Sequence, residues 1–199
     1  MRLASEFRPG RNERVTKPEL RARLIGELRA AEREHSSAAI CAAIREHAAW
    51  QAARLVCAFL PLPTEPQIAS LWEDERAPAF CFPRVRDGEV ELIRLDDPAH
   101  RRQATWKLDE AHHDHAPIVA PGEVDLFLVP GLAFTANGAR LGRGGGFYDR
   151  LLPRRSAHSR ALGICFALQV LEDIPREPHD QRVDAVITEH GLLGRQKSG

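Results

Sequence analysis

The spacing of apolar residues near the start of the chain predicts two helices. Four of them recur at helical intervals on one face: Leu20, Leu24, Ile25 and Leu28. Thr16 stands where a helix cap is expected, with Pro18 in the first turn and Glu19 at the third helical position. Residues 36–37, both serine, interrupt the pattern, so a second helix is predicted over residues 38–50.

Short apolar segments farther along the chain predict strands. They occupy residues 54–60, 79–83, 90–95, 124–129, 161–166 and 183–188. Residues 55–60 and 124–129 are almost continuously apolar, which is typical of strands in a parallel sheet covered on both faces. Residues 67–75 and 147–152 between them have helical character, and the alternation of strands with helices indicates an α/β fold. The Arg-Asp-Gly-Glu sequence at 86–89 predicts a tight hairpin turn.

Two segments lack these patterns. Residues 1–16 contain arginines, a Pro-Gly pair and few large apolar groups, which predicts a flexible N-terminal extension. Residues 96–123 are polar and contain prolines at 98, 117 and 121, which predicts a long surface loop suited to ligand binding. We therefore expect residues 17–199 to form a single domain.

The composition excludes several classes of protein. The 28 basic and 28 acidic residues give a formal net charge of zero, which argues against a dedicated nucleic-acid or membrane-surface binder. No apolar run approaches the roughly 18 residues of a spanning helix, and the N-terminus lacks the apolar core of a secretory signal. Three of the four cysteines lie in apolar segments, which predicts buried thiols in a reducing compartment. We therefore expect a cytoplasmic protein that binds neither nucleic acid nor membrane.

A glycine-rich segment carries the clearest functional signal. Gly142, Gly144, Gly145 and Gly146 follow an apolar strand and precede a predicted helix. Four glycines within five positions let backbone N–H groups converge, and the neighbouring arginines at 140 and 143 make the place suitable for phosphate. The segment matches neither a P-loop nor the dinucleotide G-x-G-x-x-G motif. By composition alone, a flexible glycine-rich turn with solvated arginines remains the simpler alternative.

This segment resembles the signature of the 5-formyltetrahydrofolate cyclo-ligase (5,10-methenyltetrahydrofolate synthetase) family. The family pattern is Val-Pro-Gly-x-Ala-Phe, then Arg-Leu-Gly-x-Gly-x-Gly-Tyr-Tyr-Asp, and residues 129–134 and 140–149 are similar to it. Residues 17–21 resemble the N-terminal Lys-x-x-Leu-Arg of the family, and Glu65 lies in a segment like its substrate side. Residues 163–189 resemble its C-terminal block, so the resemblance covers roughly residues 17–190.

The resemblance implies a three-layer α/β/α fold with a mainly parallel sheet, similar to phosphosugar isomerases and CoA-transferases. It also implies an enzyme that uses ATP and Mg²⁺ to convert 5-formyltetrahydrofolate to 5,10-methenyltetrahydrofolate, ADP and phosphate. Its partners would be small molecules, and no oligomeric state is predicted.

The resemblance also implies roles for individual residues. The ATP-binding residues would be Lys17, Arg21, Arg140, Leu141, Gly142, Arg143, Gly144, Gly145, Gly146, Phe147 and Tyr148. The folate-binding residues would be Leu60, Glu65, Arg143, Gly144, Gly145, Gly146 and Phe147. Arg143 and Tyr148 would be catalytic, and Asp149 and Asp180 would be Mg²⁺ ligands.

Several positions depart from the family pattern. After Glu65-Pro66 the family usually has an acidic residue and then a threonine, whereas Gln67, Ile68 and Ala69 follow here. Phe147 replaces a tyrosine, and residues 103–121 lack a Gly-Ile-x-Glu-Pro segment. These differences lie on the folate side, so two alternatives remain open. One is a paralogue that acts on another formyl or acyl substrate, and the other is a non-catalytic folate- or nucleotide-binding protein. The His-His-Asp-His run at 112–115 is interpreted as a solvated loop, because adjacent histidines rarely converge on one metal ion.

Overall fold

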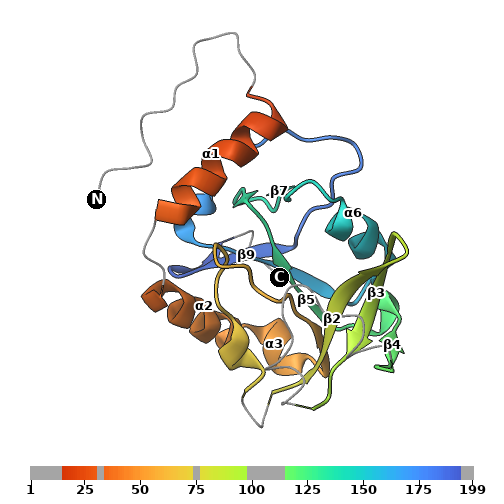
Figure 1. Cartoon of the computed structure of the whole chain (residues 1–199). Coiled ribbons are helices and arrows are strands. Elements are labelled where there is room, and N and C mark those ends of the chain that lie inside the picture. Colours follow the sequence, from red (N-terminus) through yellow and green to blue (C-terminus); the bar gives the residue numbers. More distant parts are fainter. Residues whose placement is uncertain (1–14, 31–33, 74–76, 98–114, 194–199) are drawn as a thin grey trace.

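The computed structural model describes residues 15–30, 34–73, 77–97 and 115–193, which form a mixed β-sheet with helices packed against it (Figure 1). Most of the predicted N-terminal extension (residues 1–14) and much of the predicted loop (residues 98–114) lie outside the described residues. Within the described residues, no helix combines the length and apolar character that a membrane span requires.

The sheet is mainly parallel, as expected. Its strands are β1 (Leu55–Cys57), β2 (Ala79–Arg86), β3 (Glu89–Arg94), β4 (Ile118–Val119), β5 (Leu126–Pro130), β8 (Arg160–Ile164), β9 (Ala185–Thr188) and β10 (Gly191–Leu193). In the part of the chain that the structure describes, they form an eight-stranded sheet in the order β10-β9-β8-β5-β1-β2-β3-β4. The central strands β9, β8, β5, β1 and β2 are parallel, and the strands outside them are antiparallel.

Helices cover both faces of this sheet. They are α1 (Lys17–Ala30), α2 (Glu34–Glu46), α3 (Ala48–Ala52) and α6 (Phe147–Leu151). Alternate side chains of β5 enter two separate cores, because successive residues of a strand point to opposite faces. Leu126 and Leu128 pack in the core that contains α1, α2 and α3, whereas Phe127 and Val129 pack in the core that contains α6. The predicted α/β fold is therefore confirmed.

Two local predictions are confirmed by hydrogen bonds and backbone angles. Helix α1 begins directly after Thr16, whose backbone N–H and hydroxyl both donate to Glu19 Oε2 at 2.8 Å. The hairpin between β2 and β3 turns at Asp87 and Gly88, whose φ angles of 50° and 81° are both positive. Positive φ at both central residues is what a type I′ hairpin turn requires.

The predicted second helix is wrong at both ends. Helix α2 begins at Glu34 and passes through both serines, and the chain breaks at His47 before α3. Ser37 is buried, and its Oγ accepts the backbone N–H of Gln67 at 3.0 Å, so this hydroxyl bonds to a distant segment rather than competing with the helix. His47 Nδ1 accepts the N–H of Ala49 and thereby caps α3.

Two further predictions are wrong in part. Residues 67–73 contain a single 3-10 turn, η1 (Ala69–Leu71), instead of an α-helix. This segment is held against α2 by side chains such as Arg45, whose Nη2 donates to the Ser70 carbonyl at 2.7 Å. The end of the predicted surface loop contains strand β4 and the 3-10 turn η2 (Pro121–Glu123).

Candidate functional site

The order of the strands creates a topological switch point between β1 and β5. These two strands are adjacent and parallel, but the chain leaves β1 toward β2 on one side and β5 toward β8 on the other. The connections that leave their carboxyl ends therefore diverge, and ligands of α/β proteins bind at such a switch point. Glu65 lies in the connection after β1, and residues 142–146, here called the glycine loop, lie in the connection after β5.

The glycine loop depends on backbone conformations that favour glycine. It is reached through a small hairpin, β6 (Ala133–Phe134) paired with β7 (Arg140–Leu141), that continues from β5. Gly144 has a φ of 110° and Gly146, just before α6, has a φ of 61°. Residues with a side chain rarely adopt such φ angles, so this loop conformation requires glycine at these two positions.

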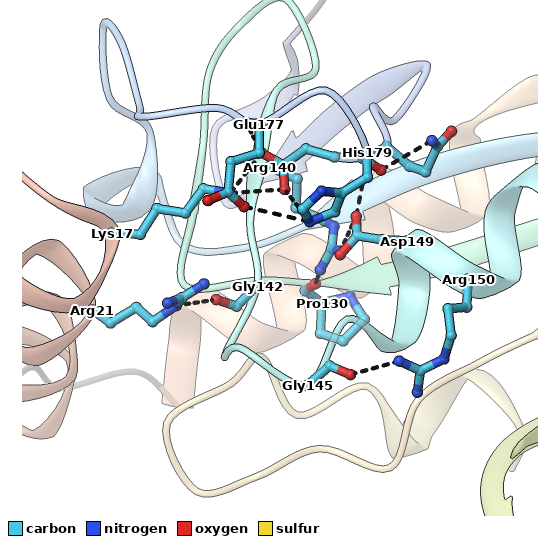
Figure 2. Close-up of polar contacts among 12 residues, drawn as sticks. Lys17, Arg21, Pro130, Arg140, Gly142, Gly145, Asp149, Arg150, Glu177 and His179 are labelled. Carbon is cyan, nitrogen blue, oxygen red and sulfur yellow. Dashed lines mark hydrogen bonds and ion pairs between the residues drawn. The ribbon is translucent and has the colours of Figure 1, made fainter. Parts of the chain in front are cut away.

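Two arginines hold carbonyl groups of the glycine loop from opposite sides. Arg21 extends from α1 and its Nε donates to the Gly142 carbonyl at 2.9 Å, while Arg150 of α6 donates from Nη1 to the Gly145 carbonyl at 3.1 Å (Figure 2). The predicted residue Arg21 therefore does reach the loop. Arg150 was not singled out from the sequence.

Lys17 of α1 lies in a cluster of charged residues from the C-terminal part of the chain (Figure 2). Its Nζ donates to both oxygens of Asp180 at 2.9 and 2.7 Å and to Glu177 Oε2 at 2.9 Å. Burial by itself would lower the pKa of Lys17, but the hydrogen bonds to Asp180 and Glu177 outweigh it and raise the pKa. Burial would raise the pKa of Asp180, but the hydrogen bonds from Lys17 and from the Glu177 backbone lower it.

Arg140 and Asp149 form a buried ion pair beside the loop. Arg140 Nη2 donates to both carboxylate oxygens at 3.1 Å, and the exposed fractions of the two side chains are 4% and 17%. The backbone N–H of Gln181 donates to Asp149 Oδ1 at 3.0 Å. The Arg140 guanidinium also lies over the Tyr148 ring, 5.4 Å from its centroid. The side chain expected to contact phosphate therefore points into the protein.

Arg143 connects the glycine loop to the connection after β1. Its Nε donates to Glu65 Oε1 at 3.0 Å, and its Nη2 donates to the Thr64 hydroxyl at 2.8 Å. The other Glu65 oxygen accepts the backbone N–H of Leu62 at 3.0 Å, so the buried carboxylate is held in one orientation. This contact joins the predicted ATP and folate segments.

The remaining predicted residues lie around these groups. Tyr148 is buried, and among the described residues its hydroxyl has no hydrogen-bond partner. Burial raises the pKa of Tyr148, and the nearby thiol of Cys57 raises it further. The rings of Phe147 and Tyr148 lie 5.2 Å apart, and Leu60 is half-buried after β1.

The donor set suits a hard cation. Asp149 and Asp180 offer carboxylate oxygens, the ligand type that Mg²⁺ prefers, and the Asp149 carboxylate bonds to the residue that follows Asp180. Within the described residues, one potential ligand atom each from Glu177, His179 and Asp180 lie within 4.8 Å of one another. Glu177 and Thr64 were not predicted, and their only signal in the sequence is their closeness to His179-Asp180 and to Glu65.

Fold and site together define an α/β protein whose candidate ligand site, at the carboxyl edge of a parallel sheet, combines a glycine loop with basic side chains. The profile of the 5-formyltetrahydrofolate cyclo-ligase family matches residues 13–189. The chain belongs to this family of enzymes, which confirms the resemblance inferred from the motifs.

Individual relatives agree with the family match. A 5-formyltetrahydrofolate cyclo-ligase from Mycolicibacterium smegmatis is 34% identical over 142 residues, which cover 68% of this chain and 73% of the relative. The protein of that name from Mus musculus is 28% identical over 190 residues, covering 89% and 93%. The solved structure of 5,10-methenyltetrahydrofolate synthetase from Aquifex aeolicus superimposes with a TM-score of 0.77 at 28% identity, covering 92% of this chain and 94% of the other.

Proposed function

We propose that this chain uses ATP and Mg²⁺ to convert 5-formyltetrahydrofolate to 5,10-methenyltetrahydrofolate, releasing ADP and phosphate. The names of its relatives support this assignment. The observation that carries it is the contact between Arg143 of the glycine loop and Glu65 of the connection after β1. A phosphate-type loop that contacts a buried carboxylate can place two small molecules next to each other, which is the main requirement of a transfer reaction.

On the ATP side, we propose that the backbone of the glycine loop, with Leu141, Phe147 and Tyr148 beside it, surrounds the phosphates. Lys17 and Arg21 approach from α1 and supply positive charge. Arg140 contributes its charge from inside the protein, since only 4% of its side chain is exposed. Its direct contact with Asp149 makes it, in this proposal, also the residue that orients that carboxylate.

Asp149 and Asp180 are the proposed Mg²⁺ ligands, directly or through water. When bound, Mg²⁺ would supply positive charge against the phosphate oxygens. Among the described residues, Asp149 Oδ2 accepts a single hydrogen bond, from Arg140, so a lone pair remains available on it. Lys17 now neutralises Asp180, and we propose that the Lys17 ammonium turns to the phosphates when the cation takes its place.

On the folate side, we propose that Glu65 accepts hydrogen bonds from N–H groups of the pterin, and that Leu60 and Phe147 contact its ring. The carboxylate already has a fixed orientation through Leu62, so little ordering is needed when the substrate binds. The Tyr148 hydroxyl has no partner among the described residues, and an unpaired buried hydroxyl costs about 1–3 kcal/mol. A ligand atom that bonds to it would recover this energy.

The chemistry proposed for the site is activation of a poor leaving group. The formyl oxygen of the substrate attacks the γ-phosphorus and ADP leaves, which turns that oxygen into a phosphate ester. The neighbouring folate nitrogen then attacks the formyl carbon and closes the ring, its N–H proton is released to solvent, and the C–O bond breaks as phosphate departs. The protein mainly positions the groups and stabilises charge, and Arg143 and Tyr148 are the proposed catalytic residues.

The direct test combines the purified protein with 5-formyltetrahydrofolate and MgATP and follows the near-ultraviolet absorbance of the methenyl product. We expect a rise that requires both ATP and Mg²⁺. The Lys17→Met variant should lose at least tenfold in rate, because a charge-assisted contact to phosphate is removed. Arg23→Met is the matched control on α1, where Arg23 pairs with Glu27 at the surface, and it should retain the wild-type rate.

Two results would contradict this proposal. A rise without ATP would exclude phosphoryl activation. No rise from a protein that binds MgATP by calorimetry would exclude this substrate, and turnover of ATP with other formyl donors would then identify a paralogue.

We also propose a reducing compartment such as the cytoplasm. Cys41, Cys57, Cys81 and Cys165 are all free and buried. Free thiols at every cysteine position are typical of reducing compartments.

A further inference from the structure

Arg143 is held by two residues of one connection. Nε donates to Glu65 and Nη2 donates to Thr64, at 3.0 and 2.8 Å. Arg21 and Arg150 hold the loop backbone on either side, through the Gly142 and Gly145 carbonyls, but they do not bond to the Arg143 side chain. The side chain is also 34% exposed. Its orientation therefore depends on these two contacts.

The two contacts use a single edge of the guanidinium group. In the planar fork of arginine, Nε and Nη2 share one edge, and Nη1 and Nη2 share another. Glu65 and Thr64 occupy the first edge, and among the described residues Nη1 has no hydrogen-bond partner. The second edge thus retains the paired donors that bind phosphate oxygens bidentately.

Glu65 and Thr64 contribute differently to this arrangement. The ion pair with Glu65 fixes the position of Nε but leaves the plane of the guanidinium free to rotate about that hydrogen bond. The bond from Nη2 to the Thr64 hydroxyl removes this rotation, because two contacts on one edge define the plane. The Thr64 hydroxyl therefore decides where the free edge points.

We propose that Thr64 is a positioning residue for Arg143 and directs the Nη1–Nη2 edge of the guanidinium toward the terminal phosphate of ATP. This inference rests on the proposed function. Thr64 touches neither substrate in the proposal and acts only through Arg143. The alternative is that Thr64 only stabilises the connection after β1. Gln67 already stabilises that connection through hydrogen bonds to the Leu62 and Glu65 carbonyls.

The test compares Thr64→Val, which removes the hydroxyl at similar volume, with Thr64→Ser, which keeps it. Calorimetry with Mg²⁺ measures the preference for a non-hydrolysable ATP analogue over ADP, and this preference does not depend on folate turnover. We expect Thr64→Val to lower the preference about tenfold with unchanged ADP affinity, and Thr64→Ser to stay close to wild type. The kcat of the cyclisation should fall by a similar factor with an unchanged KM for the folate.

A second comparison separates positioning from other roles. If Thr64 acts through Arg143, adding Thr64→Val to Arg143→Ala should cause no further loss in the ATP-over-ADP preference. Additive losses, or a wild type that binds the analogue and ADP equally, would overturn the proposal. A wild type that shows the preference but does not convert the folate would refute the proposed substrate and leave the role of Thr64 supported.

Discussion

Replacing Asp149 with alanine should destabilise the protein strongly, apart from any effect on catalysis. The carboxylate accepts two hydrogen bonds of 3.1 Å from Arg140 and one of 3.0 Å from the Gln181 backbone. The other hydrogen bond of the guanidinium, from Nη1 to the Pro130 carbonyl, is long at 3.5 Å. Among the described residues, Asp149→Ala therefore leaves the Arg140 charge with this long hydrogen bond and the Tyr148 ring, and without an anion, while only 4% of the side chain is exposed.

The size of the effect follows from burial. Removing one member of a buried ion pair costs about 3–5 kcal/mol. Asp149 is 17% exposed, so water can partly hydrate the space that its removed carboxylate leaves beside Arg140. We therefore take the lower end of that range. A loss of about 3 kcal/mol corresponds to a decrease in Tm of roughly 6–12 °C for a domain of this size.

Thermal unfolding followed by circular dichroism, without ligands, measures this effect. Asp96→Ala is the matched control, because the Arg94–Asp96 pair has exposed fractions of 42% and 62% and such surface pairs contribute about 0–1 kcal/mol. The Arg140→Met, Asp149→Ala double variant should recover much of the loss, because the buried charge is gone. The reasoning is refuted if the Tm of Asp149→Ala stays within about 2 °C of wild type, or if the double variant loses the sum of both single changes.

Three other predictions concern the Lys17–Asp180 pair and Gly138. Because the pKa of Asp180 is lowered in the folded protein, the ion pair contributes stability above the unfolded pKa of about 4, and this contribution is lost as the pH falls through the folded pKa. Because the pKa of Lys17 is raised, its contribution is present below the unfolded pKa of about 10 and is lost as the pH rises through the folded pKa. In a Tm-against-pH series, the stability advantage of wild type over Asp180→Asn should therefore shrink below about pH 4, and a constant difference would exclude the ion pair as its source. Asp180→Asn should also raise the Mg²⁺ concentration for half-maximal activity, and an unchanged Mg²⁺ titration would remove Asp180 from the proposed ligand set. Gly138→Ala should prevent stable folding, because Gly138 has a φ of 84° and its added Cβ would overlap the Val183 carbonyl oxygen. A soluble variant with wild-type Tm would contradict this.

Short-range patterns in the sequence were sufficient for much of the fold. The apolar run at 124–129 predicted β5, and the Thr16–Glu19 pair predicted where α1 begins. The Asp87-Gly88 pair predicted the hairpin turn because positive φ is a property of those residue types themselves. Each of these features depends on residues a few positions apart, so the local sequence is sufficient to predict it.

Elements that depend on distant partners could not be predicted in this way. The serines before residue 38 were expected to end a helical segment, yet Ser37 lies within α2 because its hydroxyl accepts a hydrogen bond from Gln67, 30 positions away. The helix expected at 67–75 is absent from the described residues 67–73 for a related reason, since α2 side chains bind that segment in a more extended form. Local propensity is a weak preference, and a few tertiary hydrogen bonds outweigh it.

The same division holds for the site. A glycine loop flanked by arginines could be predicted from the sequence, because glycine and charge are properties of the residues. The inward turn of Arg140 to Asp149, and the contact of Arg143 with Glu65 across 78 positions of sequence, depend on the folded chain. The physical reason is the strand order: the chain leaves β1 and β5 in opposite directions, which brings two connections together that no local pattern relates.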